Sequence, residues 1–74
     1  MKEKRYLTIS FGTNLKKLRR KAKLSQESLA RKIKISRQSI SKWEQDISYP
    51  SILYLLPLTK ILNCSLEELL KDLN

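Results

Sequence analysis

Residues 26–45 read QESLARKIKISRQSISKWEQ and contain two short amphipathic stretches. Only Lys34, Ile35 and Ser36 separate them, and Ala30 places a small side chain where the second stretch must cross the first closely. This spacing predicts a helix-turn-helix motif over about residues 26–45. The apolar positions expected to face the core are Leu29, Ile33, Ile35, Ile40 and Trp43.

One short pattern marks three helix starts. In this pattern an apolar residue precedes a serine, and a second apolar residue follows the serine four positions later. This is the spacing of a hydrophobic staple around a serine N-cap. The pattern occurs at Leu24-Ser25 with Leu29, at Ile35-Ser36 with Ile40, and at Cys64-Ser65 with Leu69. It predicts helices that start at Gln26, Arg37 and Leu66. Glu68 completes a capping box with Ser65.

Two further helices complete the expected architecture. Apolar residues recur every 3.6 residues over about residues 10–22, which predicts an amphipathic first helix with a cationic outer face. After Pro50 the chain is apolar nearly all round, which predicts a buried helix ending at Asn63. Pro57 leaves two alternatives, a loose first turn over residues 52–56 or a kinked helix. The expected fold class is all-α, a compact five-helix domain over residues 10–74 behind a basic tail at residues 1–9.

The positive charge is large and unevenly distributed. The 74 residues carry a net charge of +9. Residues 1–42 hold fourteen basic and two acidic side chains, whereas residues 43–74 hold two basic and five acidic ones. This asymmetry favours a polyanionic partner at one end and packing or association at the other.

Catalytic and metal-binding residues are almost absent. There is no histidine, and Cys64 is the only cysteine, which excludes an internal disulfide, a zinc site and a Cys-His nucleophile pair. We therefore expect no enzyme, no cofactor, no metal and no evident small-molecule ligand. No apolar run approaches the roughly 20 residues of a membrane helix, and the first residues lack the apolar segment of a signal peptide. We expect no membrane association and a cytoplasmic location.

Six segments between Phe11 and Leu70 carry a wider resemblance. They are Leu15-Lys-Lys-Leu-Arg19, Leu24-Ser-Gln-Glu27, Leu29-Ala30, Ile35-Ser-Arg-Gln-Ser-Ile-Ser-Lys-Trp-Glu44, Tyr49-Pro50-Ser51 and Cys64-Ser-Leu-Glu-Glu-Leu-Leu70. In these segments the chain resembles the phage repressor and Cro family, also called XRE-like. The resemblance implies a bacterial or phage-encoded five-helix domain, usually homodimeric, that binds operator DNA in the major groove and regulates transcription. The chain departs from the family at Lys34 and Asp46, where glycine is usual.

The groove-facing side of the second motif helix follows from helical angles of 100° per residue. The side expected to face the core holds Ser36, Ile40 and Trp43. The opposite side holds Gln38, Ser41, Lys42 and Gln45, with Arg37 on its flank. Because the start of a recognition helix approaches base edges, we expect Arg37, Gln38 and Lys42 to read bases of double-stranded DNA. Glutamine suits adenine, whereas arginine and lysine suit guanine, and the resemblance implies the same positions.

Phosphate contacts need donors and positive charge rather than a base-specific pattern. The start of the first motif helix presents amides to phosphate, and the resemblance implies that Gln26 is a phosphate clamp. The other expected phosphate-binding residues are Arg31, Ser36, Ser41 and Gln45. The basic side chains of residues 16–23 either extend this footprint or merely face solvent. The resemblance also implies a structural ion pair between Arg19 and Glu44.

We expect a sequence-specific transcriptional regulator that reads a near-palindromic operator as a homodimer. The favoured kind of regulator is a repressor. The C-terminal helix is expected to form the dimer contact through an apolar stripe of Leu66, Leu69, Leu70 and Leu73. An alternative is an antitoxin that masks a toxin protein and autoregulates its own promoter. Nonspecific binding of nucleic acid is disfavoured because the charge is polarised. Within this class, the sequence does not distinguish a phage repressor from a restriction-modification controller or a freestanding regulator.

Overall fold

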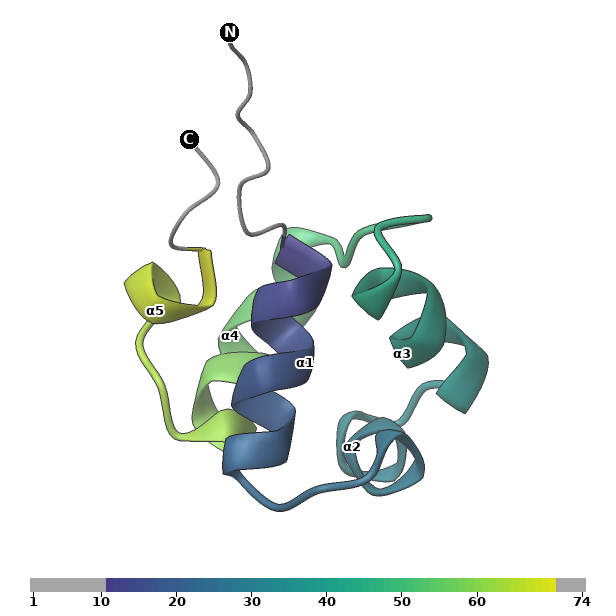
Figure 1. The fold of residues 1–74 in the computed structure, drawn as a ribbon, viewed down its shortest axis with the longest axis horizontal. Helices are drawn as coiled ribbons and strands as arrows, with labels where there is room; N and C mark the ends of the chain where they lie inside the picture. Colours follow the sequence, from purple (N-terminus) through teal and green to yellow (C-terminus); the bar gives the residue numbers. More distant parts are fainter. Residues whose placement is uncertain (1–10, 71–74) are drawn as a thin grey trace, which may run out of the picture.

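Five helices form the whole regular structure of residues 11–70, which are the residues that the computed structural model describes (Figure 1). They are α1 (Phe11–Lys21), α2 (Gln26–Ile33), α3 (Arg37–Glu44), α4 (Ile52–Leu62) and α5 (Leu66–Leu70). The all-α, five-helix prediction is confirmed. The predicted basic tail at residues 1–9 and the predicted stripe residue Leu73 lie outside the described residues.

The serine N-caps begin three helices where the sequence predicts. The Oγ atoms of Ser25 and Ser36 accept hydrogen bonds from the backbone amides three residues later, at 3.0 and 3.1 Å. At the start of α5, the Glu68 amide donates to Ser65 Oγ and the Ser65 amide donates to Glu68 Oε1, both at 2.9 Å. The predicted capping box is therefore confirmed, and it satisfies two amides that a helix start otherwise leaves unpaired.

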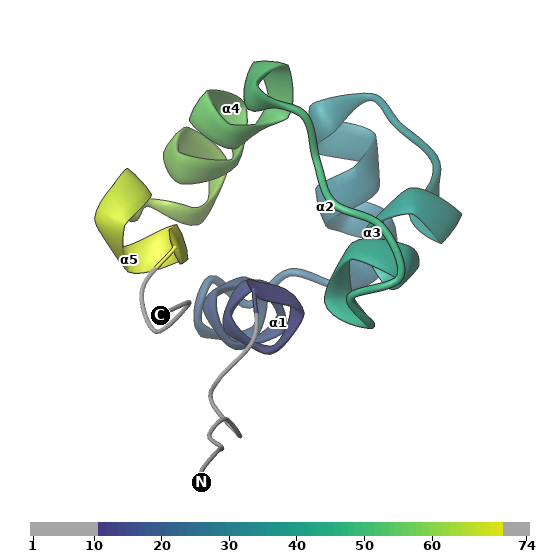
Figure 2. The ribbon, with the colours of Figure 1, turned by 90° about the horizontal axis from the view of Figure 1, so that it is seen from above.

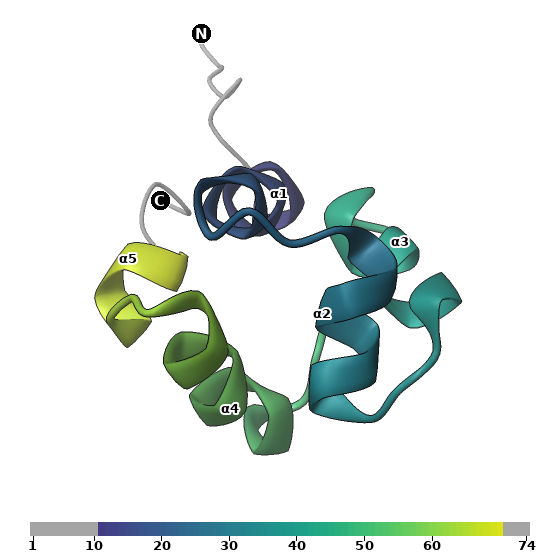
Figure 3. The same ribbon diagram turned by 90° about the horizontal axis from the view of Figure 1, so that it is seen from below.

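The helices surround one core to which each contributes one fully buried side chain. Figures 2 and 3 show them arranged around a common centre, with α1 and α4 on opposite sides. The five side chains are Leu15, Leu29, Ile40, Leu58 and Leu69, and Phe11, Ala30, Trp43 and Leu62 complete the buried cluster. The staple residues Leu24, Ile35 and Cys64 pack against it.

Helix α4 differs from the prediction of a buried helix. Leu58 and Leu62 are buried, but Ile52, Leu53 and Leu56 are 68%, 79% and 59% exposed. The small core admits one side of the helix only, so these three side chains face solvent, whereas Tyr54, Leu55 and Ile61 are half-buried against the core. Pro57 lies inside the helix, which begins at Ile52, so the alternative of a loose turn over residues 52–56 is wrong. The predicted end at Asn63 is confirmed, with φ 53° in the left-handed region.

The start of α1 touches the end of α3 through backbone. A Cβ atom on Gly12 would lie 2.4 Å from the Glu44 carbonyl oxygen and 2.6 Å from that of Trp43, so only glycine permits this approach. Asp46, at φ 60°, accepts a hydrogen bond from the Gly12 amide through Oδ1 at 3.0 Å. The departure from glycine at Asp46 thus provides a cap for α1. Lys34, the other departure from glycine, also lies in the left-handed region, at φ 69°.

Helix α5 is held against α1 by a buried polar side chain. Asn14 is 5% exposed, and its Nδ2 donates to the backbone oxygens of Glu68 and Leu69, both at 2.6 Å. Both carbonyls belong to the last turn of α5, so Asn14 ties the end of this short helix to α1. No local sequence pattern indicates this contact, because its two sides are more than fifty residues apart.

Candidate nucleic-acid interface

Helix α3 presents one face to the core and one to solvent. Ile40 and Trp43 are buried, whereas Arg37, Gln38 and Lys42 are exposed. Within residues 11–70 the side chains of Gln38 and Lys42 form no hydrogen bond or ion pair. Their donors and the acceptor of Gln38 are therefore available to a ligand.

The serines and the glutamine at the two ends of α3 make local contacts. Ser36 is exposed rather than core-facing, because its hydroxyl caps α3 and lies 3.0 Å from Ser39 Oγ. Gln45 Nε2 donates to the backbone oxygen and the hydroxyl of Ser41, at 3.1 and 2.8 Å. Ser41 and Gln45 are thus brought together at the end of the helix, and Ser36 lies at its start.

A buried ion pair joins α1 to the end of α3. Arg19 Nε donates to Glu44 Oε2 at 2.6 Å, and Arg19 Nη2 donates to Glu44 Oε1 at 3.1 Å. The side chains are only 9% and 3% exposed, and Arg19 Nη1 donates to the Leu24 backbone oxygen at 2.8 Å. A bidentate pair of this kind is geometrically rigid, so it fixes α3 relative to α1 and to the turn before α2.

Gln26 connects this ion pair to the surface of α3. Its Nε2 donates to Glu44 Oε1 at 3.0 Å, and its Oε1 accepts from Arg37 Nη1 at 3.3 Å. The start of α2 is therefore adjacent to the start of α3. No sequence pattern indicates this contact, because its four residues come from three helices.

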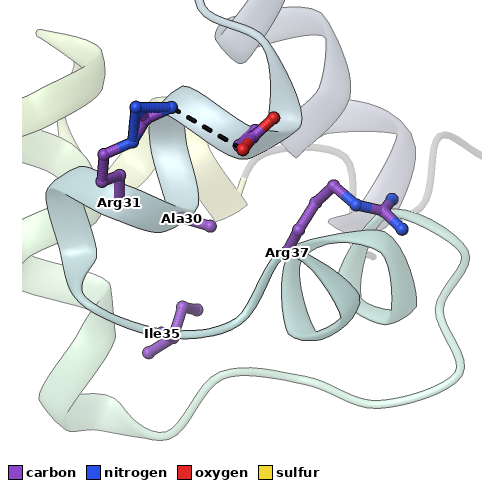
Figure 4. A pocket seen from close by; sticks show the side chains of 5 residues that line it. Ala30, Arg31, Ile35 and Arg37 are labelled. Atoms are coloured by element: carbon purple, nitrogen blue, oxygen red, sulfur yellow. Dashed lines mark ion pairs between the residues drawn. The ribbon is translucent and has the colours of Figure 1, made fainter.

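The remaining basic residues lie on the flanks. Arg31 is exposed and lies 4.0 Å from Glu27, a solvent-exposed contact of small energetic value. In Figure 4, Arg31 of α2 and Arg37 of α3 lie on opposite sides of Ala30, around an open hollow of about 310 Å³. Further exposed basic side chains come from α1 and the two turns of residues 22–25 and 34–36. They are Lys16, Lys17, Arg20, Lys21, Lys23 and Lys34.

Other kinds of site find little support in the described part of the chain. No group of three metal-ligating side chains gathers among residues 11–70. No helix in that range is long and apolar enough to cross a membrane. Cys64 is half-buried between α4 and α5, and burial, followed by the charge of Glu68, raises the pKa of its thiol. A raised pKa lowers the reactivity of a thiol near neutral pH.

Comparison with known sequences places this arrangement among helix-turn-helix proteins. Residues 15–69 match the helix-turn-helix family model. The chain is 37% identical over 62 residues to the transcriptional activator BcrR of Enterococcus faecalis, covering 84% of the chain and 30% of BcrR. It is 41% identical over 57 residues to the transcriptional regulator DicA of Escherichia coli, covering 77% and 42%. The chain thus spans less than half the length of these two relatives.

Two solved structures have the same fold, at sequence identities close to those of the relatives above. The P22 c2 repressor, in complex with a synthetic operator, superposes with a TM-score of 0.78 at 35% identity, over 85% of this chain and 96% of that one. The restriction-modification controller C.AhdI of Aeromonas hydrophila superposes with a TM-score of 0.75 at 31% identity, over 82% and 92%. The match thus extends over nearly all of each of these two solved chains.

Proposed function

The chain belongs to the XRE-type helix-turn-helix family, a class of transcription-regulator domains rather than of enzymes, and from this we propose that it is a sequence-specific DNA-binding regulator of the repressor type. The observation that carries the proposal is the exposed face of α3. Gln38 and Lys42 project from it without partners in residues 11–70, on a helix that a buried ion pair fixes in place. Fixed geometry is what base reading requires.

The proposed contacts divide into base readers and phosphate anchors. Arg37, Gln38 and Lys42 enter the major groove with the first two turns of α3. The anchors are Gln26, Arg31, Ser36, Ser41 and Gln45. The first-turn amides of α2 and the exposed positive charge support this division, because they supply attraction to phosphate without reading sequence.

We also propose that the protein binds DNA as a homodimer through the side of the molecule that carries α4 and α5. Leu69 is fully buried and Leu70 is half-buried, so most of the described stripe on α5 packs in the monomer core. Leu66 remains 39% exposed, and α4 adds Ile52, Leu53 and Leu56. Exposed apolar side chains at this density support a protein contact, and a two-fold axis would match a palindromic operator.

Selection of bound duplexes from a random pool tests the function. We expect a preferred near-palindromic site whose half-sites are roughly 34 Å apart, about one turn of DNA. A pool that shows no preferred sequence after repeated rounds would contradict the proposal. A preferred site without symmetry would contradict only the homodimer.

A further inference from the structure

A hollow of about 330 Å³ opens between the end of α1 and the turn that joins α4 to α5 (Figure 1). We call it the Cys64 hollow. Most of its lining side chains are apolar, namely Leu18, Ala22, Ile61, Leu62 and Cys64. None of the residues proposed to contact DNA or a second protomer lines it, so neither proposed role accounts for this part of the surface.

The apolar wall of the Cys64 hollow is only partly covered in the monomer. Leu62 is 4% exposed, whereas Leu18, Ala22 and Ile61 are half-buried. Covering such surface with an apolar ligand is favourable, because it removes the remaining area from water. Ligand pockets start at about 300 Å³, and an apolar cavity of about 150 Å³ already holds benzene. The hollow therefore has room for an apolar body of roughly eight carbon atoms.

The rim of the hollow carries one positive charge without a partner. Lys21 is exposed and lines the hollow, and its side chain forms no hydrogen bond or ion pair within residues 11–70. Glu68 also lies at the rim, but its Oε1 already accepts a hydrogen bond from the Ser65 amide at 2.9 Å. The charge that remains available to a ligand is therefore the ammonium of Lys21, which a long flexible stem can bring to the opening.

From these observations we propose that the Cys64 hollow binds a small amphipathic anion. Its aliphatic chain lies against the half-buried apolar wall, and its carboxylate pairs with Lys21. Both parts of the ligand are needed, since an exposed ion pair alone contributes little and the apolar wall alone does not select an anion. The hollow beside Ala30 differs, because Glu27, Arg31 and Arg37 make its lining mostly charged. The inference does not depend on DNA binding, because the two sites share no residue.

Octanoate is the probe that tests the inference, and the thiol of Cys64 is the reporter because it lies in the wall and is the only cysteine. The rate of iodoacetamide reaction is measured on the full chain at one fixed pH while octanoate is added. We expect saturating octanoate to slow the reaction about fivefold or more, because a bound ligand covers the thiol. Acetate, which has the charge without the chain, is expected to give no protection. Octylamine, with the chain and the opposite charge, is expected to protect less.

Three substitutions locate the binding, which calorimetry measures as the Kd of octanoate. Ala22→Leu fills the hollow and is expected to weaken binding roughly tenfold. Lys21→Met keeps most of the stem and removes the charge, so we expect a weakening of about threefold, the size of an exposed ion pair. The matched control is Lys17→Met, which removes an exposed charge from the same helix away from the hollow and should leave the Kd unchanged.

Several outcomes would overturn the inference. Octanoate that leaves the alkylation rate unchanged, or acetate that slows it equally, would show that the hollow takes no amphipathic anion. Equal Kd values for Lys21→Met and Lys17→Met would show that Lys21 does not receive the carboxylate. Circular dichroism checks the fold of Ala22→Leu. Lys21 is exposed, so its variant reports even if Ala22→Leu does not fold.

Discussion

Asp46 Oδ1 accepts a hydrogen bond from the Gly12 backbone amide at 3.0 Å, which ties the second residue after α3 to the first turn of α1. The contact brings backbone against backbone, and the Gly12 Cα approaches the carbonyls of Trp43 and Glu44 too closely for a side chain. The position of α3 is therefore set from two sides, by this junction near its end and by the ion pair between Arg19 and Glu44.

Replacing Gly12 tests the junction. Gly→Ala inside a helix normally stabilises it, by up to about 1 kcal/mol. Here the added Cβ would overlap two backbone oxygens, so we expect Gly12→Ala to lower the free energy of unfolding by about 1–3 kcal/mol. Urea denaturation measures the change. Lys16→Ala, on the exposed side of the same helix, is the control and is expected to change stability little. A stabilised Gly12→Ala protein would contradict the close approach.

The ion pair between Arg19 and Glu44 is expected to be strongly coupled. Because each partner leaves an uncompensated buried charge when the other is removed, Arg19→Ala and Glu44→Ala should each cost about 3–5 kcal/mol. The double variant should cost much less than the sum of the two. A double-mutant cycle by denaturation measures the coupling, and additive losses would show that the pair contributes nothing of its own.

Substitution of a base reader and substitution of a phosphate anchor are expected to affect DNA affinity differently. If Gln38 reads adenine, Gln38→Ala should cost about 1–3 kcal/mol per half-site on the preferred duplex and leave binding to random DNA nearly unchanged. If Arg31 neutralises phosphate, Arg31→Ala should weaken every sequence alike and lower the salt slope by about one unit. Both variants are titrated on operator and scrambled duplexes over a series of salt concentrations. These titrations distinguish base reading from phosphate neutralisation. Equal losses for Gln38→Ala on both duplexes would mean that another face of α3 enters the groove.

The dimer contact is testable at Leu53, which is 79% exposed and does not contribute to the monomer core. We expect Leu53→Glu to halve the mass in solution by light scattering while the circular dichroism spectrum stays unchanged. Lys60→Gln, at another exposed position of α4, is the control and is expected to remain dimeric. A wild-type protein that is monomeric both free and on DNA would contradict the proposed homodimer.

Cys64 is expected to react slowly with alkylating reagents. Burial and the charge of Glu68 raise the pKa of the thiol above its usual value, so the reactive thiolate forms at higher pH in the folded protein than in urea. For the same reason, stability contributed by the thiol is present below the unfolded pKa and is lost as pH rises through the folded pKa. Rates of iodoacetamide reaction against pH measure the difference. Glu68→Gln, which keeps the capping bond, should shift the profile part of the way back.

The sequence predicts the helices better than it predicts their surroundings. Helix starts depend on local contacts, and the serine caps at residues 25, 36 and 65 carry that information within four residues. The exposed face of α4 was predicted wrongly, because a run of leucines does not reveal how many of them a small core can accept. The contacts of Gln26 and Asn14 were missed for a related reason. Each joins elements whose relative placement is known only once the chain has folded.

The division of the core among the helices makes the domain a single cooperative unit. Since α1 to α5 each supply one fully buried side chain, no two or three of them enclose a core of their own. Even the short α5 contributes to this core, because Leu69 is fully buried and the last-turn carbonyls of Glu68 and Leu69 accept hydrogen bonds from the buried Asn14. We therefore expect a fragment that ends before Leu66 to lose the fixed arrangement of α3. Dissection of this molecule into a minimal reading motif would yield an unfolded peptide.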